Sequence, residues 1–223
     1  MRTVDLSRPI RGGMPVYPGD PEVSISRALT VAADGVEVAR LELGSHTGTH
    51  LDAPSHSIDG GAAVDEIPLD LCWGPALVLR VRPVGADARI GPEQLEAPLP
   101  DELPARVLVA TGWDRYFGDP LAPAHPSLTV ELAERLWEAG ARLLGVDTLS
   151  PDPTGEGALG APGAWQDSAP LPVHDLWLGR GGVIVENLMG LVDLPETIEL
   201  VALPLRLDGV DGSPVRAVAR VRR

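Results

Sequence analysis

One stretch decides how this chain is read: His46-Thr47-Gly48-Thr49-His50-Leu51-Asp52-Ala53-Pro54-Ser55-His56. It holds three of the five histidines in a chain of 223 residues, together with a carboxylate. Neutral imidazoles and carboxylates are ligands that suit zinc, manganese or iron. Scattered surface histidines would rarely reach this density, so the stretch predicts a metal-dependent enzyme.

The spacing within this stretch favours an extended chain over a helix. The three residues after His46 form helices poorly, whereas a strand of period two places His46, Gly48, His50 and Asp52 on one side. A fully extended strand would hold the two histidines roughly 13 Å apart, too far for one ion at ~2 Å from each nitrogen. We therefore expect the chain to bend, with Gly48 as the hinge.

Outside this stretch, short apolar strands and one helix dominate. Nearly continuous apolar runs predict buried strands, and they lie at residues 76–81, 106–111, 143–147, 182–186, 198–203 and 215–221. Looser alternation predicts two more strands, at residues 22–28 and 36–43.

Apolar residues at helical spacing predict an amphipathic helix over residues 130–139, with Thr129 as its N-cap and Gly140 as its stop. Shorter helical turns are expected at residues 62–67, 92–95 and 174–178. A helix followed by an apolar strand indicates an α/β fold. The length predicts one domain, or at most two small ones, and we expect a single domain over residues 1–223.

Composition excludes several function classes. A net charge of −14 disfavours nucleic acid and anionic membranes as partners. No lysine is present, which removes Schiff-base chemistry and the P-loop lysine. Cys72 is the single cysteine and cannot form an internal disulfide, which fits a cytoplasmic protein. Residues 1–20 lack the apolar core of a signal peptide, and no apolar run reaches transmembrane length.

Two remote residues are candidates for completing a binuclear site. His174 begins a short helical stretch, and Glu186 ends an apolar strand that would bury it. A buried carboxylate needs a partner, and a metal ion would be one. A salt-bridged structural role explains each residue equally well at this point.

Five blocks of the chain together resemble the cyclase family, whose best-known members are bacterial kynurenine formamidases. The blocks are the stretch from His46 to His56, Tyr17-Pro18-Gly19-Asp20, Thr111-Gly112-Trp113, Gly145-Val146-Asp147-Thr148 and Ile184-Val185-Glu186-Asn187-Leu188. They occur in the expected order and span nearly the whole chain. The resemblance implies a compact α/β domain of mixed β-sheets with few helices, of the swivelling β/β/α type, assembled as a homodimer or larger homo-oligomer.

The same resemblance implies two divalent metal ions, with zinc as the first expectation and manganese as the second. It places His46 and His50 on the first ion and His174 on the second. Asp52 would bridge the two ions, and Glu186 would contact both.

The resemblance also implies roles in catalysis and substrate binding. His56 would be the general acid and base rather than a ligand, and Tyr17 stands where the formamidases carry a substrate-stacking tryptophan. One departure is Asp175, because the formamidases show a histidine pair where this chain reads His174-Asp175. Both differences bear on the substrate more than on the chemistry.

The expected reaction is hydrolysis of a small amide, foremost the aryl formamide N-formyl-L-kynurenine. A metal-activated water would attack the carbonyl carbon, and His56 would carry the proton to the leaving amine. Hydrolysis of a cyclic amide such as isatin, or of a lactone, is the alternative within the family.

Two readings of other classes fit less well. A non-catalytic structural zinc site would be closed by four protein ligands, often cysteines, and this chain has one cysteine. A serine hydrolase of the α/β type would carry a Gly-x-Ser-x-Gly elbow, which the sequence lacks.

Several residues keep two interpretations. Asp147 either orients a metal ligand or caps a turn, and residues 151–172 form either an active-site loop or a long connection. Trp113 and Trp165 either line an aromatic pocket or pack. His125, beside Pro126, is expected to lie in a loop.

Overall fold

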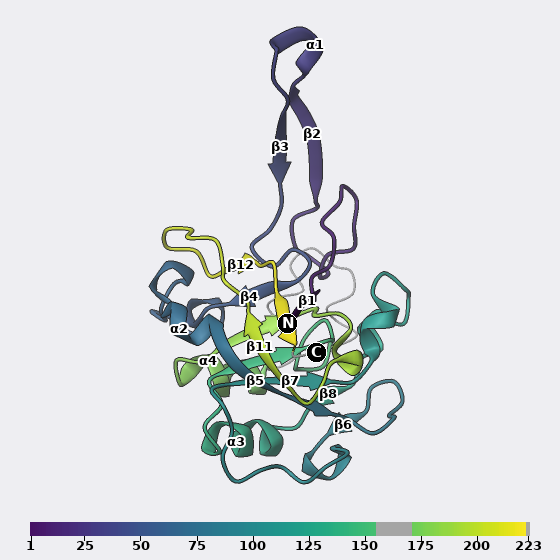
Figure 1. Ribbon diagram of the computed structural model, residues 1–223, viewed down its shortest axis with the longest axis vertical. Helices are drawn as coiled ribbons and strands as arrows, with labels where there is room; N and C mark the ends of the chain where they lie inside the picture. Colours follow the sequence, from purple (N-terminus) through teal and green to yellow (C-terminus); the bar gives the residue numbers. More distant parts are fainter. Residues whose placement is uncertain (155–170, 222–223) are drawn as a thin grey trace.

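A mixed β-sheet forms the centre of the molecule (Figure 1). The computed structural model describes residues 1–154 and 171–221, and within them this sheet has nine strands in the order β1-β13-β11-β5-β7-β9-β10-β4-β12. In chain order the strands are β1 (Arg2–Asp5), β4 (His50–Asp52), β5 (Trp73–Arg80), β7 (Arg106–Ala110), β9 (Leu143–Val146), β10 (Val183–Glu186), β11 (Thr197–Val201), β12 (Gly212–Pro214) and β13 (Val218–Val221). The expected α/β class is confirmed.

The central strands β5, β7, β9 and β10 run parallel, and antiparallel strands flank them on both sides. All residues of β7, β9 and β10 are buried. Burial on both faces explains why parallel strands read as continuous apolar runs. The strands predicted from such runs are confirmed, since they fall on β5, β7, β9, β10, β11 and β13.

Two helices cover one face of the sheet. The predicted helix is α3 (Val130–Glu138), and the Thr129 side chain caps it by accepting a hydrogen bond from the Leu132 amide. α4 (Pro172–Gly179) packs beside it, and the buried Trp177 joins the apolar cluster that both helices share with the sheet. Within the described residues no helix has the length and apolar character needed to cross a bilayer.

The remaining elements are short. They are α1 (Val31–Asp34), α2 (Leu69–Cys72), the strand pair β2 (Ser24–Leu29) and β3 (Val38–Glu42), and the strand pair β6 (Arg89–Ile90) and β8 (Ser127–Leu128). Single 3-10 turns lie at Val64–Glu66 and Pro92–Gln94, where short helical turns were expected. Cys72 is buried and unpaired, as expected of a packed thiol.

β2, α1 and β3 form an arm, residues 24–42, that extends away from the body at the top of Figure 1. Every residue of these three elements is exposed. Strands were expected here, and both are confirmed. Exposed apolar side chains line the arm, among them Ile25, Leu29, Val31, Val38 and Leu41.

The short strand β4 decides where the chemistry lies. It is paired antiparallel to β10 on one side and to β12 on the other. His50 is opposite Glu186 in the first pairing, and Asp52 is opposite Gly212 in the second. The pairing therefore brings the histidine-rich stretch against a strand end from the second half of the chain.

Candidate metal centre

The chain turns sharply before it enters β4. Gly48 has a φ of +64°, a left-handed conformation that glycine adopts without strain. The turn folds His46 back toward His50, and the centroids of the two rings lie 4.9 Å apart. The predicted bend at Gly48 is confirmed, and it brings the two imidazoles close enough to share an ion.

β4 and β10 together set the positions of His50, Asp52 and Glu186. His50 Nδ1 lies 2.9 Å from the carbonyl oxygen of Gly48. Because a carbonyl only accepts hydrogen bonds, Nδ1 carries the proton and Nε2 is the nitrogen left for an ion. That Nε2 lies 3.2 Å from Asp52 Oδ1 and 3.3 Å from Glu186 Oε2.

His174 is oriented by a carboxylate that the sequence analysis missed. The fully buried Asp152 accepts hydrogen bonds from the amides of Val173 and His174 at the start of α4, and its Oδ2 lies 2.8 Å from His174 Nδ1. The remaining nitrogen, Nε2, lies 3.3 Å from Glu186 Oε1 and 3.9 Å from Asp52 Oδ2. A carboxylate behind a ligand histidine is the usual outer partner of a metal site.

His46 lies between two carboxylates. Its Nδ1 is 2.7 Å from Asp52 Oδ1, and its Nε2 is 2.8 Å from Asp211 Oδ2. The same Asp211 oxygen lies 3.2 Å from Nδ1 of His56, whose ring centroid is 4.1 Å from that of His46. Asp211 directly precedes β12, and nothing in its sequence surroundings marked it as part of the site.

Two buried oxygen atoms show that the cluster fits cations. Asp52 Oδ2 and Glu186 Oε1 are buried and make no hydrogen bond. An unpaired buried carboxylate oxygen is costly, and a bound cation removes that cost. Both atoms face His174 Nε2, whereas Asp52 Oδ1 and Glu186 Oε2 face His50.

The contacts therefore separate into two groups of ligand atoms. One contains His46 Nδ1, His50 Nε2, Asp52 Oδ1 and Glu186 Oε2, and the other contains His174 Nε2 with the two orphaned oxygens. His56 also brings a ligand atom within 4.8 Å of atoms of His46 and Asp52. The mixture of imidazole and carboxylate suits zinc or manganese.

The ionisation of these groups shows how strongly the cluster attracts positive charge. Burial opposes protonation of His46, but hydrogen bonds to Asp211 and Asp52 raise its pKa to about 9. Burial also opposes protonation of His174, but the hydrogen bond to Asp152 and the nearby charge of Glu186 raise its pKa to about 10. Although burial acts the other way, the histidine neighbours hold the pKa of Asp52 well below its usual value.

Tyr17 and Asp20 lie in the same electrostatic environment. Burial raises the pKa of Tyr17, a hydrogen bond to Thr154 lowers it, and the charge of Glu186 raises it again. Burial raises the pKa of Asp20, which the charges of His46 and its neighbours lower. Asp20 is a further acidic residue that sequence reasoning did not select. Asp175, in contrast, is exposed on α4 beside the buried His174.

Asp147 caps a turn. Its carboxylate accepts hydrogen bonds from the Thr111 amide and hydroxyl and from the Gly112 amide. Burial raises its pKa to about 6. These contacts join the ends of β7 and β9 and support the turn-capping alternative.

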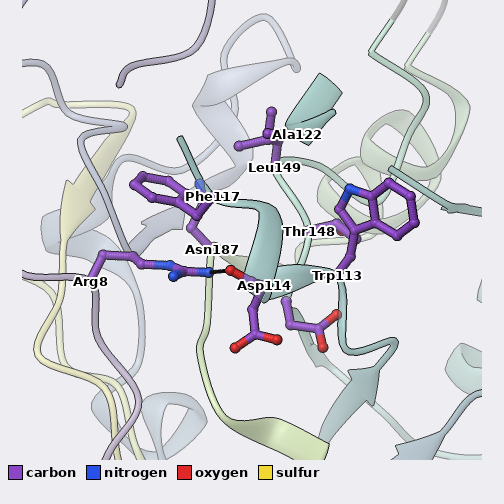
Figure 2. A pocket seen from close by; sticks show the side chains of 9 residues that line it. Arg8, Trp113, Asp114, Phe117, Ala122, Thr148, Leu149 and Asn187 are labelled. Carbon is purple, nitrogen blue, oxygen red and sulfur yellow. Dashed lines mark hydrogen bonds between the residues drawn. The ribbon is translucent and has the colours of Figure 1, made fainter. Parts of the chain in front are cut away.

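Trp113 lines a small hollow beside this turn, together with Arg8, Asp114 and Phe117 (Figure 2). Arg8 donates a hydrogen bond to the Asp114 carbonyl at 2.5 Å, and its guanidinium lies 4.4 Å from the centre of the Phe117 ring. The hollow has room for about one water molecule. It is too small for an aromatic substrate, so Trp113 packs here.

The remaining residues with open interpretations are His125, Trp165 and the loop at residues 151–172. His125 follows a 3-10 turn and is buried, with Nε2 2.8 Å from Thr154 Oγ1. Trp165 and most of the expected loop at 151–172 lie outside the described residues.

Comparisons with known proteins give a consistent result. A family model described as Putative cyclase matches residues 4–153. A kynurenine formamidase of Paracidovorax citrulli (strain AAC00-1) is 37% identical over 221 residues, covering 97% of this chain and 95% of the relative.

Two solved structures are similar along nearly their whole length. Isatin hydrolase A from Labrenzia aggregata superposes with a TM-score of 0.80 at 28% identity, covering 100% of this chain and 94% of the other. A predicted metal-dependent hydrolase from Bacillus stearothermophilus gives 0.72 at 28% identity, with coverage of 98% and 97%.

Proposed function

This chain belongs to the cyclase family of metal-dependent amide hydrolases, and we propose that it is an arylformamidase acting on N-formyl-L-kynurenine. The observation that carries the hydrolase chemistry is the pair of orphaned oxygens on Asp52 and Glu186, which face His174, while the other oxygens of the same two carboxylates face His46 and His50. The formamidase relative, similar over nearly the full length of both chains, supports the choice of substrate.

We assign the ligands by the contacts described above. His46 and His50 would hold the first ion, His174 would hold the second, and Asp52 and Glu186 would each give one oxygen to each ion. Zinc is the first expectation and manganese the second, because both accept imidazole and carboxylate. When bound, such ions polarise a carbonyl group and lower the pKa of a coordinated water.

The chain's own residues complete the reaction. An attacking water forms the new C–O bond at the formyl carbon, and His56 accepts its proton. The C–N bond then breaks, and His56 returns that proton to the aniline nitrogen, so that formate and a free amine leave. Tyr17, half-buried beside the cluster, would contact the aromatic ring of the substrate.

The direct test is hydrolysis of N-formyl-L-kynurenine by protein reconstituted with zinc or manganese, with a chelated sample as the control. We expect turnover that is lost with chelator and restored by metal. A fully metallated protein that leaves this substrate intact would contradict the formamidase assignment.

A cyclic amide is the second candidate substrate. The superposition on isatin hydrolase A favours it, and so does the family resemblance, which implies that Tyr17 stands where the formamidases carry a tryptophan. Isatin offered under the same conditions distinguishes the two candidates, because ring opening yields isatinate and no formate.

We further propose that the protein works as a homodimer or larger homo-oligomer in the cytoplasm. The exposed apolar side chains of the arm support the assembly. The single cysteine, buried and unpaired, supports a reducing compartment.

A further inference from the structure

Asp211 is held beside the metal centre by the backbone of the sheet. It directly precedes β12, whose Gly212 is opposite Asp52 on β4. The carbonyl of Asp211 accepts a hydrogen bond from the Ala53 amide at 2.9 Å. The register of two short strands therefore fixes where this carboxylate lies.

Both oxygens of the Asp211 side chain are engaged. Oδ1 accepts a hydrogen bond from Ser45 Oγ at 2.9 Å. Oδ2 lies 2.8 Å from His46 Nε2 and 3.2 Å from His56 Nδ1. One oxygen thus contacts both His46, the proposed metal ligand, and His56, the proposed proton-transfer residue.

These contacts determine which ring nitrogens carry protons. An ionised carboxylate only accepts hydrogen bonds, so Nε2 of His46 and Nδ1 of His56 must both be donors. His46 then presents Nδ1, 2.7 Å from Asp52 Oδ1, to an ion, whose binding would displace the proton that these two groups share. His56 is left with Nε2 for accepting and returning a proton, because the nitrogen opposite a bound carboxylate is the free one.

We propose that Asp211 is a positioning residue that links the first metal site to the proton-transfer histidine. This inference rests on the proposed function for the role of His56, but the orientation of His46 does not depend on the substrate. Removing the carboxylate would release both rings at once, whereas the second ion group at His174 is held separately by Asp152.

The alternative is that Asp211 only anchors its loop. Asp208 provides a matched control, because it is an exposed aspartate on the same loop. Asp208→Asn makes the same change of charge three positions away. The Asp211 side chain is 40% exposed to solvent. A small carboxylate such as acetate can therefore enter the space that the side chain vacates in Asp211→Ala.

The experiment compares Asp211→Asn, Asp211→Ala and Asp208→Asn with the unaltered chain. Replacing a residue that hydrogen-bonds to a metal ligand typically lowers metal affinity or catalytic activity by about 10- to 100-fold. We expect kcat to fall by about that factor in both Asp211 variants, with KM within about twofold and the affinity of one zinc equivalent reduced about tenfold. Acetate should restore part of kcat to Asp211→Ala in a saturable manner, and Asp208→Asn should match the unaltered chain.

Side-chain ¹⁵N NMR of the zinc-loaded protein gives a readout that needs no substrate. In Asp211→Asn, the ring-nitrogen chemical shifts of His46 and His56 should change. Those of His125, which is hydrogen-bonded to Thr154 instead, should not change. If the unaltered chain hydrolyses neither N-formyl-L-kynurenine nor isatin, the proposed function is wrong. The histidine signals and the zinc affinity still test whether Asp211 positions His46 and His56. Unchanged signals, affinity and kcat in both Asp211 variants, or loss without acetate rescue, would overturn the proposal.

Discussion

At the scale of single residues, Asp52 is shared between the two groups of ligand atoms. Its side chain is buried, and each of its oxygens belongs to a different group of ligand atoms. His174 contacts only one of these groups. Replacing Asp52 should therefore weaken the binding of both ions, whereas replacing His174 should weaken the binding of one.

This difference can be measured as metal content. We expect Asp52→Asn to lose tight binding of both zinc equivalents, because the neutral carboxamide lacks the negative charge that both groups share and replaces one of the two ligand oxygens with a nitrogen that cannot act as a ligand. His174→Ala should retain one equivalent. Elemental analysis after dialysis at a fixed free zinc concentration gives both values, and a tight equivalent retained by Asp52→Asn would contradict the bridging role.

The sequence predicted the residues that share a motif and missed the residues that support them. His46, His50, Asp52 and His56 lie within one short stretch, so their chemistry is visible before folding. Asp152 and Asp211 reach the centre only through tertiary contacts. A lone aspartate in a loop gives no periodic signal, and this chain has 32 acidic residues from which to choose.

At the scale of secondary-structure elements, the ends of two parallel strands are joined through Asp147. The residue follows β9, and its carboxylate binds the turn after β7. Its side chain is buried, and this burial raises its pKa from 3.8 to about 6. The same elevation makes stability depend on pH.

The direction of that dependence follows from linkage. Because the folded state binds the proton more tightly than the unfolded state, Asp147 contributes stability that is complete below pH 3.8 and is lost as the pH rises through 6. A shift of this size corresponds to about 2–3 kcal/mol. The cost of Asp147→Asn to the free energy of unfolding should therefore be larger at pH 4 than at pH 7. Urea titrations of both proteins in chelator test this, and a pH-independent difference would contradict it.

The pairing of β4 with β12 makes a separate prediction. A methyl group on Gly212 would lie 2.9 Å from His46 Cε1 and 2.9 Å from the Leu51 carbonyl oxygen. Gly212→Ala should displace the His46 ring and weaken one zinc equivalent by about tenfold. Gly85→Ala is the control, since nothing lies within 4 Å of its added carbon. Competition with a chromophoric chelator measures both variants, and equal affinities would show that the ring does not need this space.

The length of a helix or strand determined whether the sequence could predict it. Buried parallel strands leave long apolar runs, and α3 has an amphipathic period with a cap. β4 and β12 have three residues each, which is too short for a period to be recognised. Their pairing depends on which strands lie on either side, and only the folded sheet supplies that information.

At the scale of the whole molecule, the arm is the feature that a single copy leaves uncovered. An isolated two-stranded hairpin is at best marginally stable in water. Ile25 and Leu41 are opposite each other across β2 and β3, and they are 43% and 60% exposed. Cover from a second copy of the chain would explain why apolar residues occur there.

Charge placed on the arm should break such an assembly. We expect the unaltered chain to have the mass of a dimer or larger species by light scattering, and the double variant Ile25→Glu, Leu41→Glu to be monomeric with unchanged circular dichroism. Leu69→Glu with Leu121→Glu places the same charge on exposed apolar residues of the body, so it should not change the mass. A monomeric unaltered chain would contradict the proposed assembly.

The position of β4 within the sheet also sets the order in which the protein can mature. Its partners β10 and β12 are both synthesised long after it, and at ~5–20 residues per second the delay on the ribosome is on the order of ten seconds. Throughout that interval β4, with His46 before it and His56 after it, has neither of its partner strands. The last quarter of translation then supplies Glu186 and Asp211 together with both missing neighbours. In the proposed ligand assignment, metal binding would therefore be a late event in biogenesis, and each ion would join ligands from residues 46–52 to ligands from residues 174–186.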